Sequence, residues 1–159
     1  MPTQDYQGMN FEHYTEGFKE SMVCVENKEH LKLISDTLND LKYNVVISPN
    51  LEDAFERIRY NQYDVLVLDE VFGGGDAGRN ELLETFQTMP INNRRKVFLA
   101  LIGNNYKTLD NMTAYTKSVN VIINVKDLPN LKVILNKAIS ENDLFYKVMK
   151  GILTDIGKA

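Results

Sequence analysis

The first residues that could do chemistry stand at the end of a short apolar run, Val65 to Leu68, which is followed by Asp69 and Glu70. A run this short, rich in Val and Leu and flanked by polar residues, is typical of a buried parallel strand. Open α/β sheets place their binding sites outside the carboxyl ends of such strands. Asp69 is therefore a candidate for a binding or catalytic role.

Two other predicted strands also end on polar side chains. Glu26 and Asn27 follow the first apolar run of the chain, and Lys126 follows the fifth. In a five-stranded sheet of order 2-1-3-4-5, strands 1 and 3 flank the point at which the winding of the chain reverses. We therefore expect Glu26, Asn27 and Asp69 to converge there, with Lys126 reaching in from the side.

Strands and helices alternate along the chain. The predicted strands are 22–25, 44–48, 64–69, 97–102 and 119–125, with helical patterns after each of them. Asn50 is a candidate N-cap for the second helix, because its side chain can accept a hydrogen bond from the first turn. Five β-α units in succession predict parallel strands with helices on both faces. The predicted fold is a flavodoxin-like, doubly wound α/β domain over residues 21–140.

The two ends of the chain fall outside this pattern. Residues 1–20 are polar with scattered aromatics, which favours an N-terminal arm or linker. The last helix has an unbroken heptad-type spacing, and residues 141–159 extend it past the predicted domain. Its stripe consists of Leu131, Leu135, Ala138, Asn142, Phe145, Met149, Ile152 and Ile156. Two interpretations stay open: the extension folds back on its own domain, or it pairs two copies of the chain into a homodimer.

Composition excludes several classes of function. The net charge of −4 argues against a general nucleic-acid surface. No apolar run approaches the about 20 residues that span a bilayer, so we expect no membrane insertion. Cys24 is the single cysteine and lies in an apolar run, which indicates a reducing, cytoplasmic compartment. His13 and His30 have no partners at metal-ligand spacing.

Three further motifs have ordinary explanations. The loop Gly73–Gly78 lacks the Gly-Lys-Ser/Thr ending of a P-loop, so we interpret it as a flexible connection. Residues 26–30 contain no glycine, which disfavours a flavodoxin-like enzyme or nucleotide binder with a phosphate loop after the first strand. The basic cluster 94–96 could bind an anion, although such clusters usually form a solvated surface.

The strand-end residues resemble those of the receiver domain of response regulators, over roughly residues 20–140. In that family two acids after strand 1 and an Asp after strand 3 hold Mg2+. The strand 3 Asp accepts a phosphoryl group from a phosphohistidine, and a Lys after strand 5 neutralises it. Mg2+ and an ammonium offset the repulsion between a carboxylate and an anionic phosphoryl group. The resemblance implies Glu26, Asn27 and Asp69 as metal ligands, Asp69 as phosphoacceptor and Lys126 as the partner cation.

The departures from the family pattern are informative. Asn27 stands where the family has its second acid, and a neutral amide there lowers the affinity for Mg2+. The family's hydroxyl after strand 4 has only Leu101 and Ile102 as counterparts, and its aromatic switch residue corresponds to Ile123. Without the hydroxyl and the aromatic ring, the usual two-state element that reads the phosphate is missing.

We therefore expect a degenerate receiver, a pseudo-receiver of bacterial two-component signalling that is not an enzyme. It would act through protein–protein interaction, with weak or absent phosphorylation. The alternative is a working receiver that is phosphorylated on Asp69 with Mg2+. The expected partner is a histidine kinase or an effector protein, because residues 140–159 are too short for a DNA-binding output domain.

Overall fold

The structure is a computed structural model, which describes residues 15–74 and 79–157. Its centre is one parallel sheet with the strand order β2-β1-β3-β4-β5. The strands are β1 (Lys19–Cys24), β2 (Tyr43–Ile47), β3 (Val65–Asp69), β4 (Phe98–Gly103) and β5 (Val121–Asn124). The predicted flavodoxin-like, doubly wound fold with the order 2-1-3-4-5 is confirmed.

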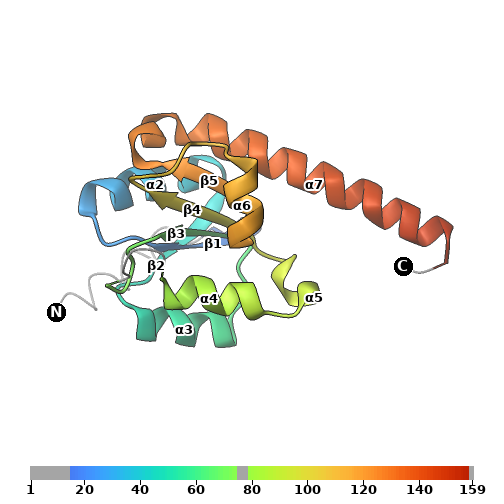
Figure 1. Cartoon of the computed structure of the whole chain (residues 1–159), viewed down its shortest axis with the longest axis horizontal. Coiled ribbons are helices and arrows are strands. Elements are labelled where there is room, and N and C mark those ends of the chain that lie inside the picture. The colour runs from blue at the N-terminus through green and yellow to red at the C-terminus, as the bar shows by residue number, and fades with distance from the viewer. Residues whose placement is uncertain (1–14, 75–78, 158–159) are drawn as a thin grey trace.

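Helices cover both faces of the sheet (Figure 1). One face carries α2 (Lys28–Asp40) and α7 (Leu131–Asp155), and the other carries α3 (Leu51–Tyr60), α4 (Glu81–Thr88) and α6 (Asn111–Lys117). A short helix, α5 (Ile91–Arg94), precedes β4, and a 3-10 helix, η1 (Val125–Asn130), leads into α7. Helices on both faces bury every residue of β3 and β4, which explains why these two strands are almost continuously apolar.

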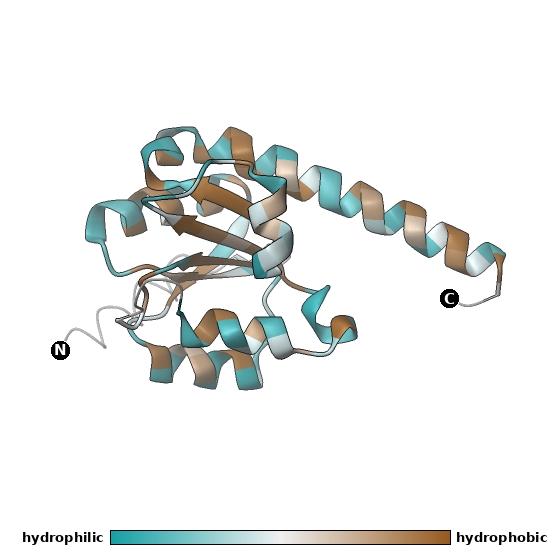
Figure 2. Cartoon of the chain, in the orientation of Figure 1, coloured by the Kyte–Doolittle hydropathy of each residue, from teal (hydrophilic) through white to brown (hydrophobic). Residues whose placement is uncertain are grey.

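The strand β3 shows how the core is divided between the two faces. All five of its residues are buried. Val65 and Val67 pack in the cluster that includes α2 and α7, whereas Leu66 and Leu68 pack in the cluster that includes α3 and α4. This alternation follows from the two-residue period of a strand. Figure 2 shows hydrophobic residues concentrated in the strands and alternating with hydrophilic residues along the surrounding helices.

Asparagine and aspartate side chains begin four of the helices. The predicted N-cap Asn50 is confirmed, because its Oδ1 accepts a hydrogen bond from the Asp53 N–H at 2.8 Å. Asn27, Asn80 and Asp110 act in the same way at the starts of α2, α4 and α6. Each such cap typically contributes about 1 kcal/mol.

Several predicted boundaries were wrong. The strand β1 starts inside the predicted arm, because Lys19 and Glu20 already pair with β2. The strand β5 starts later than residue 119, because the Asn120 side chain accepts the Leu99 N–H at 2.8 Å. The short helix α5 was not predicted. The predictions for residues 1–14 and for residues 75–78 of the glycine loop lie outside the described residues.

The helix α7 continues past the sheet instead of folding back on the described domain (Figures 1 and 2). Leu131 and Leu135 are fully buried against the sheet. Further along, Asn142 Oδ1 accepts a hydrogen bond from Asn120 Nδ2 at 3.3 Å. Beyond this bond large apolar side chains become exposed, with Ile152 at 52% and Ile156 at 60%. In the described part of the chain, no helix has the length and hydropathy that a membrane crossing requires.

Candidate functional site

A hollow of about 260 Å³ lies at the carboxyl ends of β1 and β3. The residues that line it come from the two strand ends and the loops that follow them: Glu26, Asn27, His30, Asp69, Glu70, Val71, Phe72, Gly74, Asn104 and Val125. The structure thus brings together Glu26, Asn27 and Asp69, as expected from the strand order. Their chemical roles stay predictions.

Asp69 is buried in this hollow, with 8% of its surface exposed. Its Oδ1 accepts a hydrogen bond from the Val71 N–H at 3.1 Å. Burial raises the pKa of Asp69 above its ordinary value, and the hydrogen bond from Val71 offsets only part of that effect. The neighbouring charges of Glu70 and Glu26 raise the pKa further, whereas His30 lowers it. The surroundings therefore disfavour the charged carboxylate that a nucleophile or a metal ligand must supply.

The other two predicted metal ligands are engaged in local structure. Glu26 Oε1 accepts a hydrogen bond from the Gly73 N–H at 2.7 Å. Gly73 has φ +75, and a Cβ there would lie 2.2 Å from Leu51 Cγ, so a side chain cannot replace the glycine without displacing Leu51. Asn27 Oδ1 accepts the His30 N–H at 3.0 Å and caps α2. Each residue thus uses an oxygen that a metal ion would need.

The residues present do not fit a Mg2+ site. Mg2+ needs several oxygen ligands in near-octahedral geometry. Within residues 15–74 and 79–157, no group of three or more His, Cys, Asp and Glu side chains is placed to hold a metal ion. His30 Nδ1 is buried without a hydrogen-bond partner in the described structure, but an imidazole nitrogen is not a ligand that Mg2+ prefers. We derive no reaction step through Mg2+ at this hollow.

Lys126 does not join the other predicted residues. It is exposed and lies in η1, and it does not line the hollow. The reason is that β5 ends at Asn124, whose Oδ1 accepts the Lys126 N–H at 2.9 Å and turns the chain. Among the described lining residues there is no Lys, Arg, Ser or Thr. In the described part of the chain, His30 is therefore the basic side chain beside the acids of the hollow, and no lysine, arginine or hydroxyl side chain accompanies it.

Two asparagines that were not predicted shape the loops around the hollow. Asn80 is buried and donates to the carbonyl oxygens of Glu70 at 3.0 Å and Asp69 at 3.3 Å. Asn124 donates to the Tyr106 carbonyl at 2.6 Å. The signal for Asn80 in the sequence was its place directly before a helical pattern, where asparagine is a common N-cap. Asn124 had no such signal.

The end of β4 has no room for the family's hydroxyl. Leu101 and Ile102 are fully buried in the core, and Gly103 follows them. A Cβ on Gly103 would lie 2.7 Å from Glu70 Cδ and 2.8 Å from Tyr106 Cε2. The Tyr106 side chain hydrogen-bonds to Glu70, and burial together with this bond raises the pKa of Tyr106. The position after Ile102 is thus filled by an aromatic–acid pair from neighbouring loops.

Ile123, the counterpart of the family's aromatic switch residue, is fully buried in the core on the α2 and α7 side of the sheet. The aromatic ring near the end of β4 belongs instead to Tyr106, which was not predicted from the sequence. Its hydroxyl is bonded to Glu70, a residue that also lines the hollow.

Comparisons with known proteins agree with this architecture. No protein-family model and no curated protein matches the sequence. Among solved structures, a response regulator from Thermotoga maritima is 21% identical, with a TM-score of 0.58, covering 77% of this chain and 98% of that one. The phosphorylated cyanobacterial phytochrome response regulator RcpA is 20% identical, with a TM-score of 0.61, covering 79% and 96%.

A third similar structure is the signal receiver domain of a putative Luxo repressor protein from Vibrio parahaemolyticus. It is 11% identical, with a TM-score of 0.63, and the match covers 82% of this chain and 97% of that chain. At these identities the likeness concerns the backbone, and it agrees with the strand order and the helix layers described above. The chain therefore has the fold of response-regulator receiver domains.

Proposed function

We propose that this chain is a receiver-like signalling module that acts by binding a protein partner, with weak or absent phosphorylation of Asp69. The observation that carries this proposal is the composition of the hollow beside Asp69. Its described lining contains three acids and His30, but no Lys, Arg, Ser or Thr. In this proposal the chain is not an enzyme, and its partner is a histidine kinase or an effector of a two-component system.

The chemistry of phosphoryl transfer supports this proposal. An anionic carboxylate approaches an anionic phosphoryl group only where cations or hydrogen-bond donors offset the repulsion. Here Glu26 and Glu70 add negative charge, and Lys126 is exposed on η1. The raised pKa of Asp69 points in the same direction, because a protonated carboxyl group is a poor nucleophile.

Intact-mass measurement tests the absence of phosphotransfer. We expect that incubation with acetyl phosphate and Mg2+ leaves the mass of the protein unchanged, because no described side chain neutralises an acyl phosphate at Asp69. A working receiver domain treated in the same tube confirms that the donor is active. If the wild type gains one phosphoryl group and Asp69→Ala does not, the alternative of a working receiver is correct.

The surface that we propose for protein contact is the apolar stripe of the α7 extension, formed by Leu144, Phe145, Val148, Ile152 and Ile156. These side chains are between 52% and 61% exposed. At 100° per residue they fall within about a third of the helix circumference. A stripe of this kind on a projecting helix is self-complementary, because two copies can interlock as a coiled coil. We therefore propose a second copy of the chain as its occupant.

Sedimentation velocity over a range of concentrations tests the dimer. We expect the wild type to dimerise and Val148→Glu to weaken the dimer by at least about tenfold, because an unpaired carboxylate would be buried in the interface. Val133→Glu is the matched control, since Val133 is 72% exposed on the same helix but lies about three turns before Leu144, the first residue of the stripe. A wild type that stays monomeric at all concentrations would overturn the dimer and leave the phosphorylation result unaffected.

A further inference from the structure

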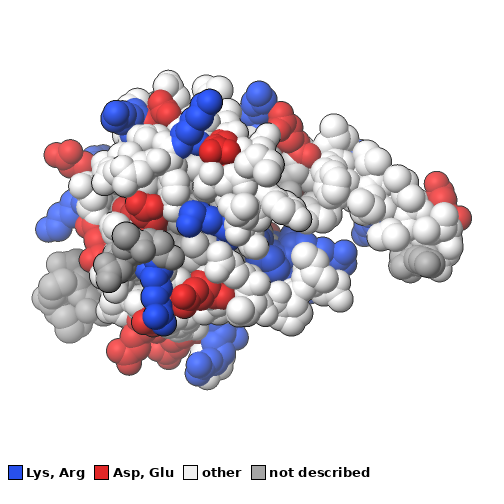
Figure 3. Space-filling model, in the orientation of Figure 1, with Lys and Arg blue, Asp and Glu red and all other residues white. Residues whose placement is uncertain are grey.

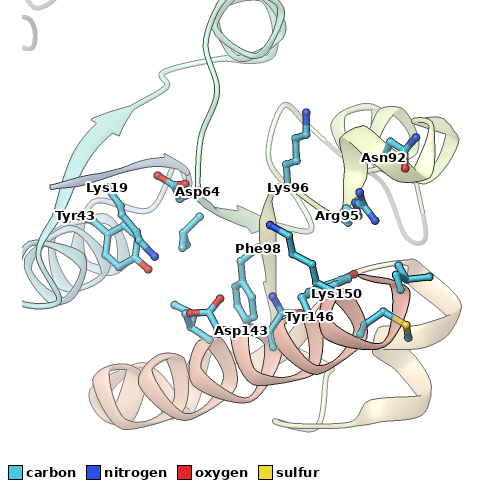
Figure 4. A pocket seen from close by; sticks show the side chains of 15 residues that line it. Lys19, Tyr43, Asp64, Asn92, Arg95, Lys96, Phe98, Asp143, Tyr146 and Lys150 are labelled. Carbon is cyan, nitrogen blue, oxygen red and sulfur yellow. The ribbon is translucent and has the colours of Figure 1, made fainter. Parts of the chain in front are cut away.

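A larger hollow lies at the opposite edge of the sheet from Asp69. Its volume is about 650 Å³, and it is bounded by the amino ends of the strands, α5 and α7 (Figure 4). We call it the basic groove, after the four cationic side chains that line it: Lys19, Arg95, Lys96 and Lys150. Its size falls within the range of small-molecule binding sites.

The cations of the basic groove have no ionic partners in the described structure. None of them lies within 4.0 Å of a carboxylate among the ion pairs of residues 15–74 and 79–157. Figure 3 shows Lys and Arg side chains gathered in the recess between the body of the domain and the α7 extension. Cations without partners around a concave surface focus a positive potential, even on a chain of net charge −4.

Arg94, the first residue of the basic cluster 94–96, has a different position. Its guanidinium group is bonded to carbonyl oxygens of the protein and to Asn120, and it does not line the groove. Arg95 and Lys96 are exposed and line the groove. The cluster thus provides two cations that are available to a ligand.

The floor of the basic groove is aromatic. Tyr43 and Phe98 are 6% and 5% exposed and line it from β2 and β4, and the half-buried Tyr146 lines it from α7. Of these rings, the half-buried Tyr146 is accessible enough to stack with a planar ring. A simple anion such as phosphate would use the cations and leave Tyr146 without a stacking partner.

Two acids stand at the other end of the basic groove. Figure 4 shows Asp64 and Asp143 on the side of Lys19 and Tyr43, across the hollow from Arg95 and Lys96. One oxygen of Asp64 accepts the Glu20 N–H at 2.9 Å. The remaining carboxylate oxygens can accept hydrogen bonds from an amino or hydroxyl group. The groove therefore presents cations, an aromatic floor and hydrogen-bond acceptors in succession.

We propose that the basic groove binds a nucleotide. Its phosphates would contact Arg95, Lys96 and Lys150, its base would stack on the half-buried ring of Tyr146, and a base amino group or sugar hydroxyl would donate to Asp143 or Asp64. The lining residues Tyr146 and Lys150 point more than a quarter turn away from Val148 of the apolar stripe, whereas Met149, which also lines the groove, borders the stripe beside Phe145 and Ile156.

Isothermal titration calorimetry of the full chain tests the proposal, with ADP, GDP and UDP as separate probes in a buffer with EDTA. We expect at least one of them to bind with a Kd of about 100 µM or tighter. Inorganic pyrophosphate and the matching nucleoside should each bind at least about tenfold more weakly, because each lacks one half of the recognised chemistry. Circular dichroism of every variant confirms that it is folded.

Single substitutions test whether the nucleotide binds in the basic groove. Lys150→Gln and Arg95→Gln should each weaken binding about tenfold, since each removes a charge-assisted hydrogen bond to phosphate. Lys147→Gln is the matched control, because Lys147 is exposed on the same helix and does not line the groove. The proposal is overturned if no probe binds, if pyrophosphate binds as tightly as the nucleotide, if Lys147→Gln weakens binding equally, or if Asp69→Ala abolishes binding.

Discussion

Replacing Arg94 by alanine is expected to lower the free energy of unfolding by about 3 kcal/mol, because a half-buried guanidinium group holds several acceptors together. Its Nη2 donates to the Ser118 carbonyl at 2.7 Å and to Asn120 Oδ1 at 2.9 Å, and its Nη1 donates to the Val97 carbonyl at 2.8 Å. These bonds join the start of β4 to the segment between α6 and β5. Alanine would remove the Arg94 donor from the Ser118 and Val97 carbonyl oxygens, whereas Asn120 Oδ1 would keep its bond from the Leu99 N–H.

Urea unfolding measures this effect, and the chain offers a neighbouring control. Arg95 is exposed, and no ion pair of the described residues includes it, so Arg95→Ala should change the free energy of unfolding by less than about 0.5 kcal/mol. Arg94→Lys should recover little of the lost free energy of unfolding, because a single ammonium group cannot reach all the acceptors that the planar guanidinium group contacts. Equal unfolding midpoints for Arg94→Ala and Arg95→Ala would show that the hydrogen bonds of Arg94 contribute nothing to stability.

The basic cluster also shows where sequence reasoning reached its limit. Positions 94–96 look alike in the sequence, and the two predictions for them were an anion site and a solvated surface. The structure distinguishes Arg94 from Arg95 and Lys96, because the hydrogen-bond partners of Arg94 lie 24 and 26 residues away in the sequence, at Ser118 and Asn120. Long-range side-chain bonds of this kind have no periodic signature, whereas the strand β3 was recognisable from its own apolar residues.

The candidate site was predictable to the extent that it depends on strand order. Glu26, Asn27 and Asp69 meet because β1 and β3 are neighbours, and the alternation of elements was enough to predict that arrangement. Lys126 is exposed on η1 and does not line the hollow, and its position depends on where β5 ends. The strand stops at Asn124, whose side chain bonds to neighbouring backbone groups and starts η1. Element boundaries are the least reliable part of a sequence-based prediction.

The second large effect is expected at Gly103, where alanine should lower the free energy of unfolding by about 1–3 kcal/mol, the usual cost of overpacking a core. The added Cβ would lie 2.7 Å from Glu70 Cδ and 2.8 Å from Tyr106 Cε2, so the bonded Glu70–Tyr106 pair would have to move. Gly151→Ala is the matched control. Nothing lies within 4 Å of a Cβ at Gly151, and in the exposed α7 extension that change should stabilise the protein by up to about 1 kcal/mol.

Opposite signs for these two glycine-to-alanine changes, measured as unfolding midpoints, would confirm that Gly103 is held small by its neighbours. Gly103→Ser should be as destabilising as Gly103→Ala, because the clash begins at Cβ, before any hydroxyl is reached. A Gly103→Ser protein as stable as the wild type would contradict this account. If the cost is observed, the bonded Glu70–Tyr106 pair keeps position 103 small, and any side chain there requires that pair to move.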